Sequence, residues 1–280
     1  MGHEFTGRVH STGSSVQKFQ KDDLVVSPFT TSCGTCFYCS QGYSSRCEKS
    51  QLFGSAGLDG GQAEYVRVPL ADSTAMKAPD GVKEEVLVLM ADIFPTGYFA
   101  AYNGFKELDE KQRREATVVL IGCGPVALCA LMNIMDYKPK HVFAVDSVES
   151  RLELARSLGA EPWNFMTDRE GLDKRVKEVT QGRGADVVVE VVGLSPALKM
   201  GYELLRPWGI ISSVGVHNGE VSFQLAGPVG FAMVMLMVAP LVDSLDWQPR
   251  VQQELEGSDG SMPGKVHFPG GAGEAQTAPG

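Results

Sequence analysis

The segment Thr117-Val-Val-Leu-Ile-Gly-Cys-Gly-Pro-Val-Ala127 is the strongest indicator of fold in the sequence. Its first part, residues 117–121, is mostly apolar and rich in valine, which predicts a buried strand. Residues 126–135 continue as a predicted helix. A strand, a glycine turn and a helix in direct succession are typical of a dinucleotide-binding βα unit.

The turn has the pattern GxGxxA. Gly122 permits the tight turn, and Gly124 lets the backbone approach a pyrophosphate closely. Ala127 is small enough for close packing of the helix, and Pro125 suits the first helical turn, where no backbone donor is needed. The exposed amides and the positive end of the helix dipole would hold phosphate groups. The predicted cofactor contacts of the turn are Gly122, Gly124, Pro125 and Val126.

Asp146 follows Gly124 by 22 residues, at the end of the next predicted strand. Its carboxylate is placed to accept hydrogen bonds from an adenosine ribose, and it would repel a 2′-phosphate. Because Ser147 and Val148 follow instead of Arg or Lys, NAD is favoured over NADP. The alternative is a simple turn with Asp146 as the cap of the following helix. The combination of strand, turn, helix and acid favours cofactor binding.

The region around this unit alternates between predicted strands and helices. Continuous apolar strands separated by helices indicate a parallel sheet covered on both faces, so we expect an α/β fold with a doubly wound (Rossmann) sheet. The predicted strands are 117–121, 141–145, 186–192 and 210–216, and the predicted helices are 126–135, 149–158 and 172–180.

Residues 1–80 have a different texture. They are rich in Gly, Ser, Thr and Val, and short β-type runs at 7–10, 24–27 and 63–68 predict an irregular all-β lobe. Residues 83–115 look like a connector, with helical composition at 84–90 and a helix at 98–108 after a break at Pro95.

The net negative charge of the chain argues against anionic binding partners. The 280 residues carry a formal charge of −9, which would repel phosphate backbones and anionic lipid headgroups, so neither nucleic acid nor a membrane is expected as a partner. The first residues lack a basic segment followed by an apolar run, which predicts a cytoplasmic protein. The apolar run 229–242 contains Pro240 and predicts core rather than a membrane span, whereas 257–280 is Gly- and Pro-rich and predicts a disordered tail.

Four of the six cysteines are crowded into the pattern CxxCxxCx7C. Two-residue gaps let consecutive thiolates converge on one ion, and four sulfurs close a tetrahedral zinc shell without a position for substrate. We therefore predict a structural zinc site, with disulfide pairing as the alternative. The predicted ligands are Cys33, Cys36, Cys39 and Cys47, whereas Cys123 and Cys129 are interpreted as small core residues.

Two further segments mean little singly: Gly2-His3-Glu4, and Asp92-Ile-Phe-Pro-Thr-Gly-Tyr98. Together with GGQAEYV at 60–66, the cysteine pattern, the glycine turn, Asp146 and VGV at 214–216, they resemble the two-zinc members of the zinc-dependent medium-chain alcohol dehydrogenase family. The resemblance covers residues 1–216. It implies a partial GroES-like lobe before the Rossmann domain, and the DIFPTGY run is similar to the formaldehyde and polyol dehydrogenase side of the family.

The resemblance also implies site residues. His3 and Asp92 fall at positions of catalytic zinc ligands, and Glu4 at that of an adjacent acidic residue that approaches the metal. Hydride transfer between an alcohol and NAD, assisted by zinc, is the implied reaction. Residues that would contact or border the cofactor are Thr96, Arg151, Val192, Val214 and Val216.

The chain departs from the family at both ends. Family members begin several dozen residues before the GHE segment and supply there another zinc-binding cysteine, so we expect a truncated chain with a weakened catalytic zinc site. Residues from about 225 onward match no family segment. The expected domains are a partial GroES-like lobe at 1–92, an NAD-binding domain at 93–224 and an atypical tail at 225–280.

Two functions compete. The first is a zinc-dependent oxidoreductase that acts on an alcohol, a polyol or the corresponding aldehyde or ketone, as a homodimer or homotetramer. The second is a catalytically inactive remnant that binds zinc and NAD. A zinc-free quinone or enoyl reductase is disfavoured by the four cysteines and Asp92.

Overall fold

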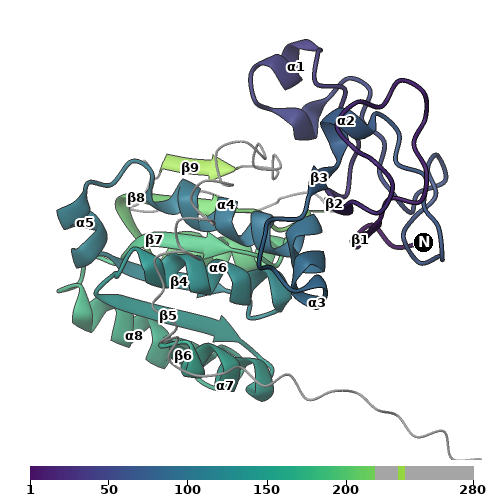
Figure 1. Ribbon diagram of the computed structural model, residues 1–280. Coiled ribbons are helices and arrows are strands. Elements are labelled where there is room, and N and C mark those ends of the chain that lie inside the picture. Colours follow the sequence, from purple (N-terminus) through teal and green to yellow (C-terminus); the bar gives the residue numbers. More distant parts are fainter. Residues whose placement is uncertain (218–232, 237–280) are drawn as a thin grey trace, which may run out of the picture. The chain divides into compact units, whose positions relative to one another are not determined.

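The glycine turn follows a central strand of a six-stranded parallel sheet, whose strands are labelled β4 to β9 in Figure 1. Its strand order is β6-β5-β4-β7-β8-β9. The strands are β4 (Thr117–Ile121), β5 (His141–Asp146), β6 (Glu161–Asn164), β7 (Ala185–Glu190), β8 (Leu205–Ser213) and β9 (Met233–Leu236). Counted from β4, this is the order 3-2-1-4-5-6 of dinucleotide-binding folds. The predicted α/β class and its parallel sheet are confirmed.

Helices cover both faces of this sheet. Side chains of β4 alternate between two apolar clusters, Val118 and Leu120 in one and Val119 and Ile121 in the other. The first cluster is completed by α4 (Ile93–Phe105), α6 (Pro125–Asp136) and α7 (Glu149–Ser157), and the second by α8 (Arg169–Val179) and α9 (Ser195–Leu204). The sheet is therefore doubly wound, because helices pack against both of its faces.

A smaller antiparallel sheet precedes the large one. It consists of β1 (Phe5–Arg8), β2 (Leu24–Ser27) and β3 (Met76–Lys77). Val26 of β2 is buried against Leu87 and Ala91. This cluster fixes the segment immediately before Asp92 to the small sheet. The short helices of this region are α1 (Phe37–Ser40), η1 (Ser44–Arg46), α2 (Ala71–Thr74), α3 (Glu84–Leu87) and η2 (Val88–Ala91), and α5 (Glu110–Glu115) precedes β4.

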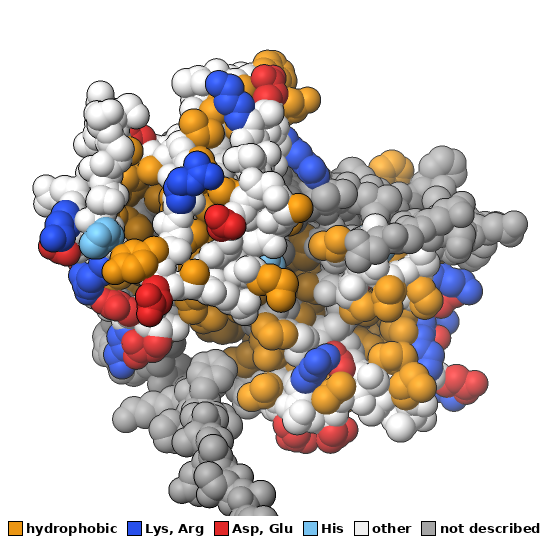
Figure 2. All heavy atoms as spheres, turned by 90° about the vertical axis from the view of Figure 1, so that its right-hand side faces the viewer, with side chains coloured by type: hydrophobic (Ala, Val, Ile, Leu, Met, Phe, Trp, Pro, Cys, Tyr) orange, Lys and Arg blue, Asp and Glu red, His pale blue; other side chains and the backbone are white. Residues whose placement is uncertain are grey.

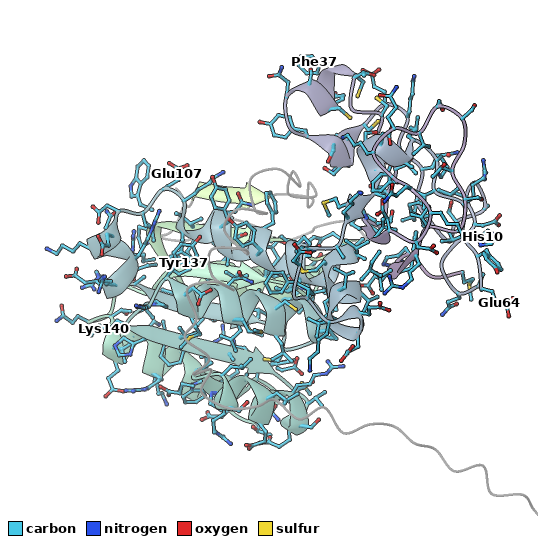
Figure 3. The ribbon with its side chains drawn as sticks, in the orientation of Figure 1. His10, Phe37, Glu64, Glu107, Tyr137 and Lys140 are labelled. Carbon is cyan, nitrogen blue, oxygen red and sulfur yellow. The ribbon has the colours of Figure 1, made fainter. Side chains whose placement is uncertain are left out.

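Three local predictions were wrong. Residues 63–68 form no strand. The ring of Tyr65 instead contacts the ring of His10 edge to face at a centroid distance of 5.1 Å. His10 is labelled in Figure 3. The strand predicted at 7–10 lies two residues earlier, at Phe5–Arg8. Pro95 does not break a helix, because it lies in the first turn of α4, where an amide has no acceptor within the helix.

The computed structural model describes residues 1–217 and 233–236, and all of these belong to one compact unit. The tail predicted at 257–280 and most of the run 229–242 lie outside the described residues. Within the described ranges, no helix has both the length and the apolar character that a membrane crossing requires. Figure 2 shows apolar side chains interspersed with charged groups of both signs on the face that it presents.

Candidate active site

The four cysteines of the predicted structural site lie together. Their sulfurs are all within 4.8 Å of one another. Backbone amides point at two of them: Cys33 N–H donates to Cys47 Sγ at 3.2 Å, and Cys36 N–H donates to Cys33 Sγ at 3.3 Å. All six cysteines of the chain are free thiols. The short helix α1 and η1 bring these sulfurs together, and they could hold one tetrahedral zinc ion.

The surroundings divide the four thiols into two kinds. Hydrogen bonds from the amide and hydroxyl of Thr35, followed by the Cys36 amide, lower the pKa of the Cys33 thiol to about 6. Burial raises the pKa of Cys39 to about 12 and also raises that of Cys47. The pKa of Cys36 is lowered by the amide of Cys39. A cation at the centre would stabilise the thiolate form of all four.

His3 and Asp92 approach each other across 89 positions of the chain. His3 Nε2 lies 3.2 Å from Asp92 Oδ2, and the Thr96 hydroxyl donates to Asp92 Oδ1 at 2.7 Å. Asp92 occupies the N-cap position of α4, yet its side chain accepts no hydrogen bond from a helix amide. The capping role that an isolated Asp92 would suggest is therefore not realised, and the carboxylate faces the histidine instead.

Close backbone packing holds the segment that carries His3. The amides of Gly61 and Gln62 donate to the carbonyls of Gly2 and Met1, both at 2.9 Å. A Cβ on Gly60 would lie 2.5 Å from the Met1 carbonyl oxygen and would overlap that of Gly2, so only glycine fits there. The GGQ segment singled out by the sequence thus fixes the approach of His3.

Glu4 stands outside the His3–Asp92 pair. Among the described residues, only the four cysteines bring three or more candidate ligand atoms within 4.8 Å of one another. The carboxylate of Glu4 instead interacts electrostatically with the thiol of Cys129 in α6. Burial raises the pKa of that thiol to about 11, and the charge of Glu4 contributes to the rise. Cys123 and Cys129 are both buried, as predicted for core residues.

The glycine turn has the geometry that its sequence predicts. Gly122 has a φ of +96°, and its amide donates to the Val145 carbonyl at 2.8 Å. Gly124 is the N-cap of α6, Pro125 is its first residue, and a Cβ on Gly124 would meet no atom within 4 Å. The amide end of α6 is therefore open to a phosphate group.

The carboxylate of Asp146 connects this turn to the end of β5. Oδ2 accepts the Cys123 amide at 2.8 Å, and Oδ1 accepts the amides of Ser147 and Val148, both of which precede α7. Arg151 Nη1 lies 3.8 Å from Oδ2. Because the amides of Ser147 and Val148 both precede α7, Asp146 does not cap that helix. Its oxygens keep lone pairs that a ribose hydroxyl could use.

The predicted nicotinamide-side valines follow β7 and β8. Val192 is 41% exposed, Val216 is 75% exposed and Val214 is buried. Gly193 and Gly215 let the two segments touch through their backbones, because a Cβ on Gly193 would lie 2.6 Å from the Val216 amide nitrogen. Glu190 was not identified from the sequence, and its carboxylate accepts hydrogen bonds from the amides of Val192 and Gly193. A charged residue at the end of the apolar run 185–190 was the available signal.

Comparison with known protein families assigns both parts of the chain. Residues 1–80 match the "Alcohol dehydrogenase GroES-like domain", and residues 116–249 match "Zinc-binding dehydrogenase". Zinc-type alcohol dehydrogenase B of Aspergillus flavus is 73% identical over 221 residues, which are 79% of this chain and 52% of that protein. The medium chain reductase/dehydrogenase ucsI of Acremonium sp. is 55% identical over 224 residues, covering 80% of this chain and 77% of that protein.

Solved structures agree with this assignment. Alcohol dehydrogenase TADH from Thermus sp. ATN1 is 34% identical, with a TM-score of 0.74, over 84% of this chain and 68% of that chain. Zinc-dependent alcohol dehydrogenase 2 from Streptococcus pneumonia, in its apo form, is 32% identical, with a TM-score of 0.78, over 92% and 71%. The chain spans about half the length of the Aspergillus protein. Its two matched segments, its sheet order and these relatives show that the chain belongs to the zinc-dependent medium-chain alcohol dehydrogenase family.

Proposed function

We propose that the chain is the cofactor- and zinc-binding part of an oxidoreductase that transfers hydride between an alcohol or polyol, or its aldehyde or ketone, and NAD. The observation that carries this function is the 3.2 Å approach of His3 Nε2 to Asp92 Oδ2. An imidazole and a carboxylate so close together are suitable zinc donors, and the Asp92 carboxylate is available because it does not cap α4. The matched family and the similarity to zinc-type alcohol dehydrogenase B support the same reaction class.

Two metal positions fit the residues present. The four cysteines supply sulfurs within 4.8 Å of one another, and amide donors support their thiolate form. His3 and Asp92 supply a nitrogen and an oxygen for a second zinc ion, and Glu4 is proposed to approach it from the same segment. The first site supports folding, and the second serves the reaction.

The cofactor would lie across the carboxyl ends of β4 and β7, where the strand order reverses. The turn at Gly122, Gly124, Pro125 and Val126 would bind the pyrophosphate, and Asp146 with Arg151 would bind the adenosine ribose. This set favours NAD because Asp146 is a carboxylate with 10% of its side chain exposed, which would repel a 2′-phosphate.

When bound, zinc supplies a Lewis acid for the substrate oxygen and NAD supplies the hydride acceptor. The chain's own residues set the geometry. Thr96 keeps its hydroxyl proton directed at Asp92 Oδ1, which leaves Oδ2 directed at His3. Thr96 is also on the first turn of α4, so we place it beside the nicotinamide together with Val192, Val214 and Val216.

The remaining assignments are proposals of the same kind. Residues 1–92 form the GroES-like lobe. Residues 93–224 form the NAD-binding domain together with β9, because β9 pairs with β8 and the match to "Zinc-binding dehydrogenase" runs to residue 249, past the expected boundary at 225. Six free cysteines are compatible with a cytoplasmic location. Assembly as a homodimer or homotetramer is supported by β9, which ends the strand order of the large sheet in the described part of the chain.

The test combines metal analysis with turnover. The purified chain is expected to bind a second equivalent of zinc beyond the cysteine site, and to reduce NAD in the presence of primary, secondary or polyol alcohols. His3→Ala should lose that second equivalent and the turnover. His10→Ala is the matched control, because His10 contacts Tyr65 and lies outside the proposed site. Zinc stoichiometry and turnover that are unchanged in His3→Ala would refute the proposed site.

A further inference from the structure

Glu190 is a fully buried acid that the proposed reaction does not yet use. It is the last residue of β7, and its relative exposure is 0%. It stands in register with Ile121, which directly precedes Gly122, and with Ser213, the last residue of β8. A buried carboxylate without partners would be strongly destabilising, so the surrounding groups must compensate for its burial.

Among the described residues, two backbone amides and one hydroxyl donate hydrogen bonds to this carboxylate. Oε1 accepts the amides of Val192 at 2.8 Å and Gly193 at 2.7 Å. Oε2 accepts the Ser213 hydroxyl at 2.5 Å, and the His217 Nε2 lies 3.1 Å from that hydroxyl oxygen and 3.5 Å from Oε2. Because each oxygen is met by hydrogens, the arrangement suits the ionised carboxylate.

These bonds tie two separate segments together. One oxygen holds the segment after β7, which carries Val192, and the other holds the end of β8, which leads to Val214 and Val216. The Glu190 carbonyl also accepts the Val214 amide at 3.0 Å. The contact of Gly193 with Val216 leaves no room for a side chain between the segments. The Glu190 side chain therefore ties the segment that carries Val192 to the end of β8, while the Glu190 backbone carbonyl holds Val214.

We propose, on the basis of the function proposed above, that Glu190 is the positioning residue for the nicotinamide end of the cofactor. It holds the segments after β7 and β8 in the arrangement that accepts the nicotinamide ring, and its fixed negative charge favours the oxidised, positively charged ring over the reduced, neutral one. The charge is effective because the Glu190 side chain is fully buried, where electrostatic interactions are weakly screened.

Ligand binding to the purified 280-residue chain tests this directly. Glu190→Gln keeps an acceptor for the Val192 and Gly193 amides and removes the charge. Calorimetry with this variant is expected to give NAD⁺ affinity lower by about tenfold, NADH affinity lower by about threefold, and ADP-ribose affinity changed by less than about twofold. ADP-ribose lacks the nicotinamide, so a general loss of structure would weaken all three ligands together.

Asp186→Asn is the matched control. Asp186 lies at the other end of the same strand, where it accepts the Thr117 amide at 2.8 Å and the Arg206 guanidinium at 2.6 Å. Its substitution removes the same charge from β7 and should leave the three affinities in place. Ser213→Ala is the second variant, in case Glu190→Gln does not fold. It removes one bond to Oε2 and should weaken both NAD⁺ and NADH by about threefold, again sparing ADP-ribose.

The outcomes separate this inference from the proposed function. Suppose that the unmodified chain and Asp186→Asn bind all three ligands, and that Glu190→Gln binds NAD⁺ as tightly as the unmodified chain does. The role of Glu190 is then refuted, and the proposed function is not. An equal loss for NAD⁺ and ADP-ribose in Glu190→Gln or Ser213→Ala also refutes it. If the folded, unmodified chain binds none of the three, the proposed function fails and this role fails with it.

Discussion

The Thr96 hydroxyl donates a 2.7 Å hydrogen bond to Oδ1 of Asp92, the N-cap residue of α4, four positions earlier. The other carboxylate oxygen, Oδ2, lies 3.2 Å from His3 Nε2. A carboxylate with one oxygen fixed in this way can present the other in a defined direction. Thr96 therefore positions the acid of the proposed catalytic zinc site and connects that site to α4, which we propose to lie beside the cofactor.

Replacing Thr96 by valine should remove this support while keeping the side-chain volume. Hydrogen-bond partners of metal ligands typically contribute about tenfold or more to metal affinity, so the second equivalent of zinc should bind about tenfold more weakly. Competition with a chromophoric chelator measures this. Thr96→Ser keeps the hydroxyl and should behave like the unmodified chain. Equal zinc affinities for the valine and serine variants would exclude a role for the hydroxyl.

Zinc uptake by the four cysteines should depend on pH with a definite sign. Cys39 and Cys47, whose pKa values are raised by burial, must lose protons for the metal to bind, so affinity should rise with pH. Cys33 has a pKa of about 6, so it is a thiolate at neutral pH and is protonated only below that value. Affinity should therefore fall most steeply below about pH 6, where protons also compete at Cys33.

Chelator competition across this pH range measures that dependence, and a pH indicator in weak buffer measures proton release. At neutral pH, zinc addition to the metal-free chain should acidify the solution, because Cys39 and Cys47 must release protons when the metal binds. Zinc affinity that is constant from about pH 5 to about pH 8 would contradict the protonation states described here.

Gly60→Ala should disturb the catalytic site and spare the structural one. The added Cβ would overlap the carbonyl oxygens of Met1 and Gly2, so the segment that carries His3 must move. We expect a loss of about 1–3 kcal/mol in the free energy of unfolding and loss of the second zinc equivalent. Thermal unfolding and metal analysis measure the two effects. Gly13→Ala is the control, because a Cβ at Gly13 meets no atom within 4 Å.

The sequence was most informative where local pattern and burial agree. The predicted strand 117–121 and the glycine turn after it were located to the residue, because β4 is buried over its whole length and reads as a continuous apolar run. The strand at 24–27 was also correct. The predicted zinc cysteines were indicated by spacing alone, since two-residue gaps constrain sulfurs to one centre.

Elements with weak local signals were missed. The strand Glu161–Asn164 contains Pro162 and is half-buried, so neither β propensity nor alternation marked it, and its position depends on pairing with β5. The helix Ser195–Leu204 contains Gly201, which is unfavourable in a helix. That glycine is required because a Cβ there would lie 2.9 Å from a methyl group of Val188. Long-range packing of this kind leaves no periodic signal.

Selectivity between NAD and NADP should depend on Asp146. Its carboxylate accepts hydrogen bonds from three amides, and its Oδ2 lies 3.8 Å from Arg151 Nη1. Neutralising the carboxylate therefore removes the negative charge that faces the Arg151 guanidinium. Asp146→Asn keeps an amide acceptor and should weaken NAD binding by about tenfold while NADP binding is retained or improved, since the repulsion of the 2′-phosphate is lost. Asp173→Asn, on the exposed side of α8, is the control. Calorimetric affinities for both cofactors decide the matter, because a variant that still prefers NAD to the original extent would exclude Asp146 as the discriminating group.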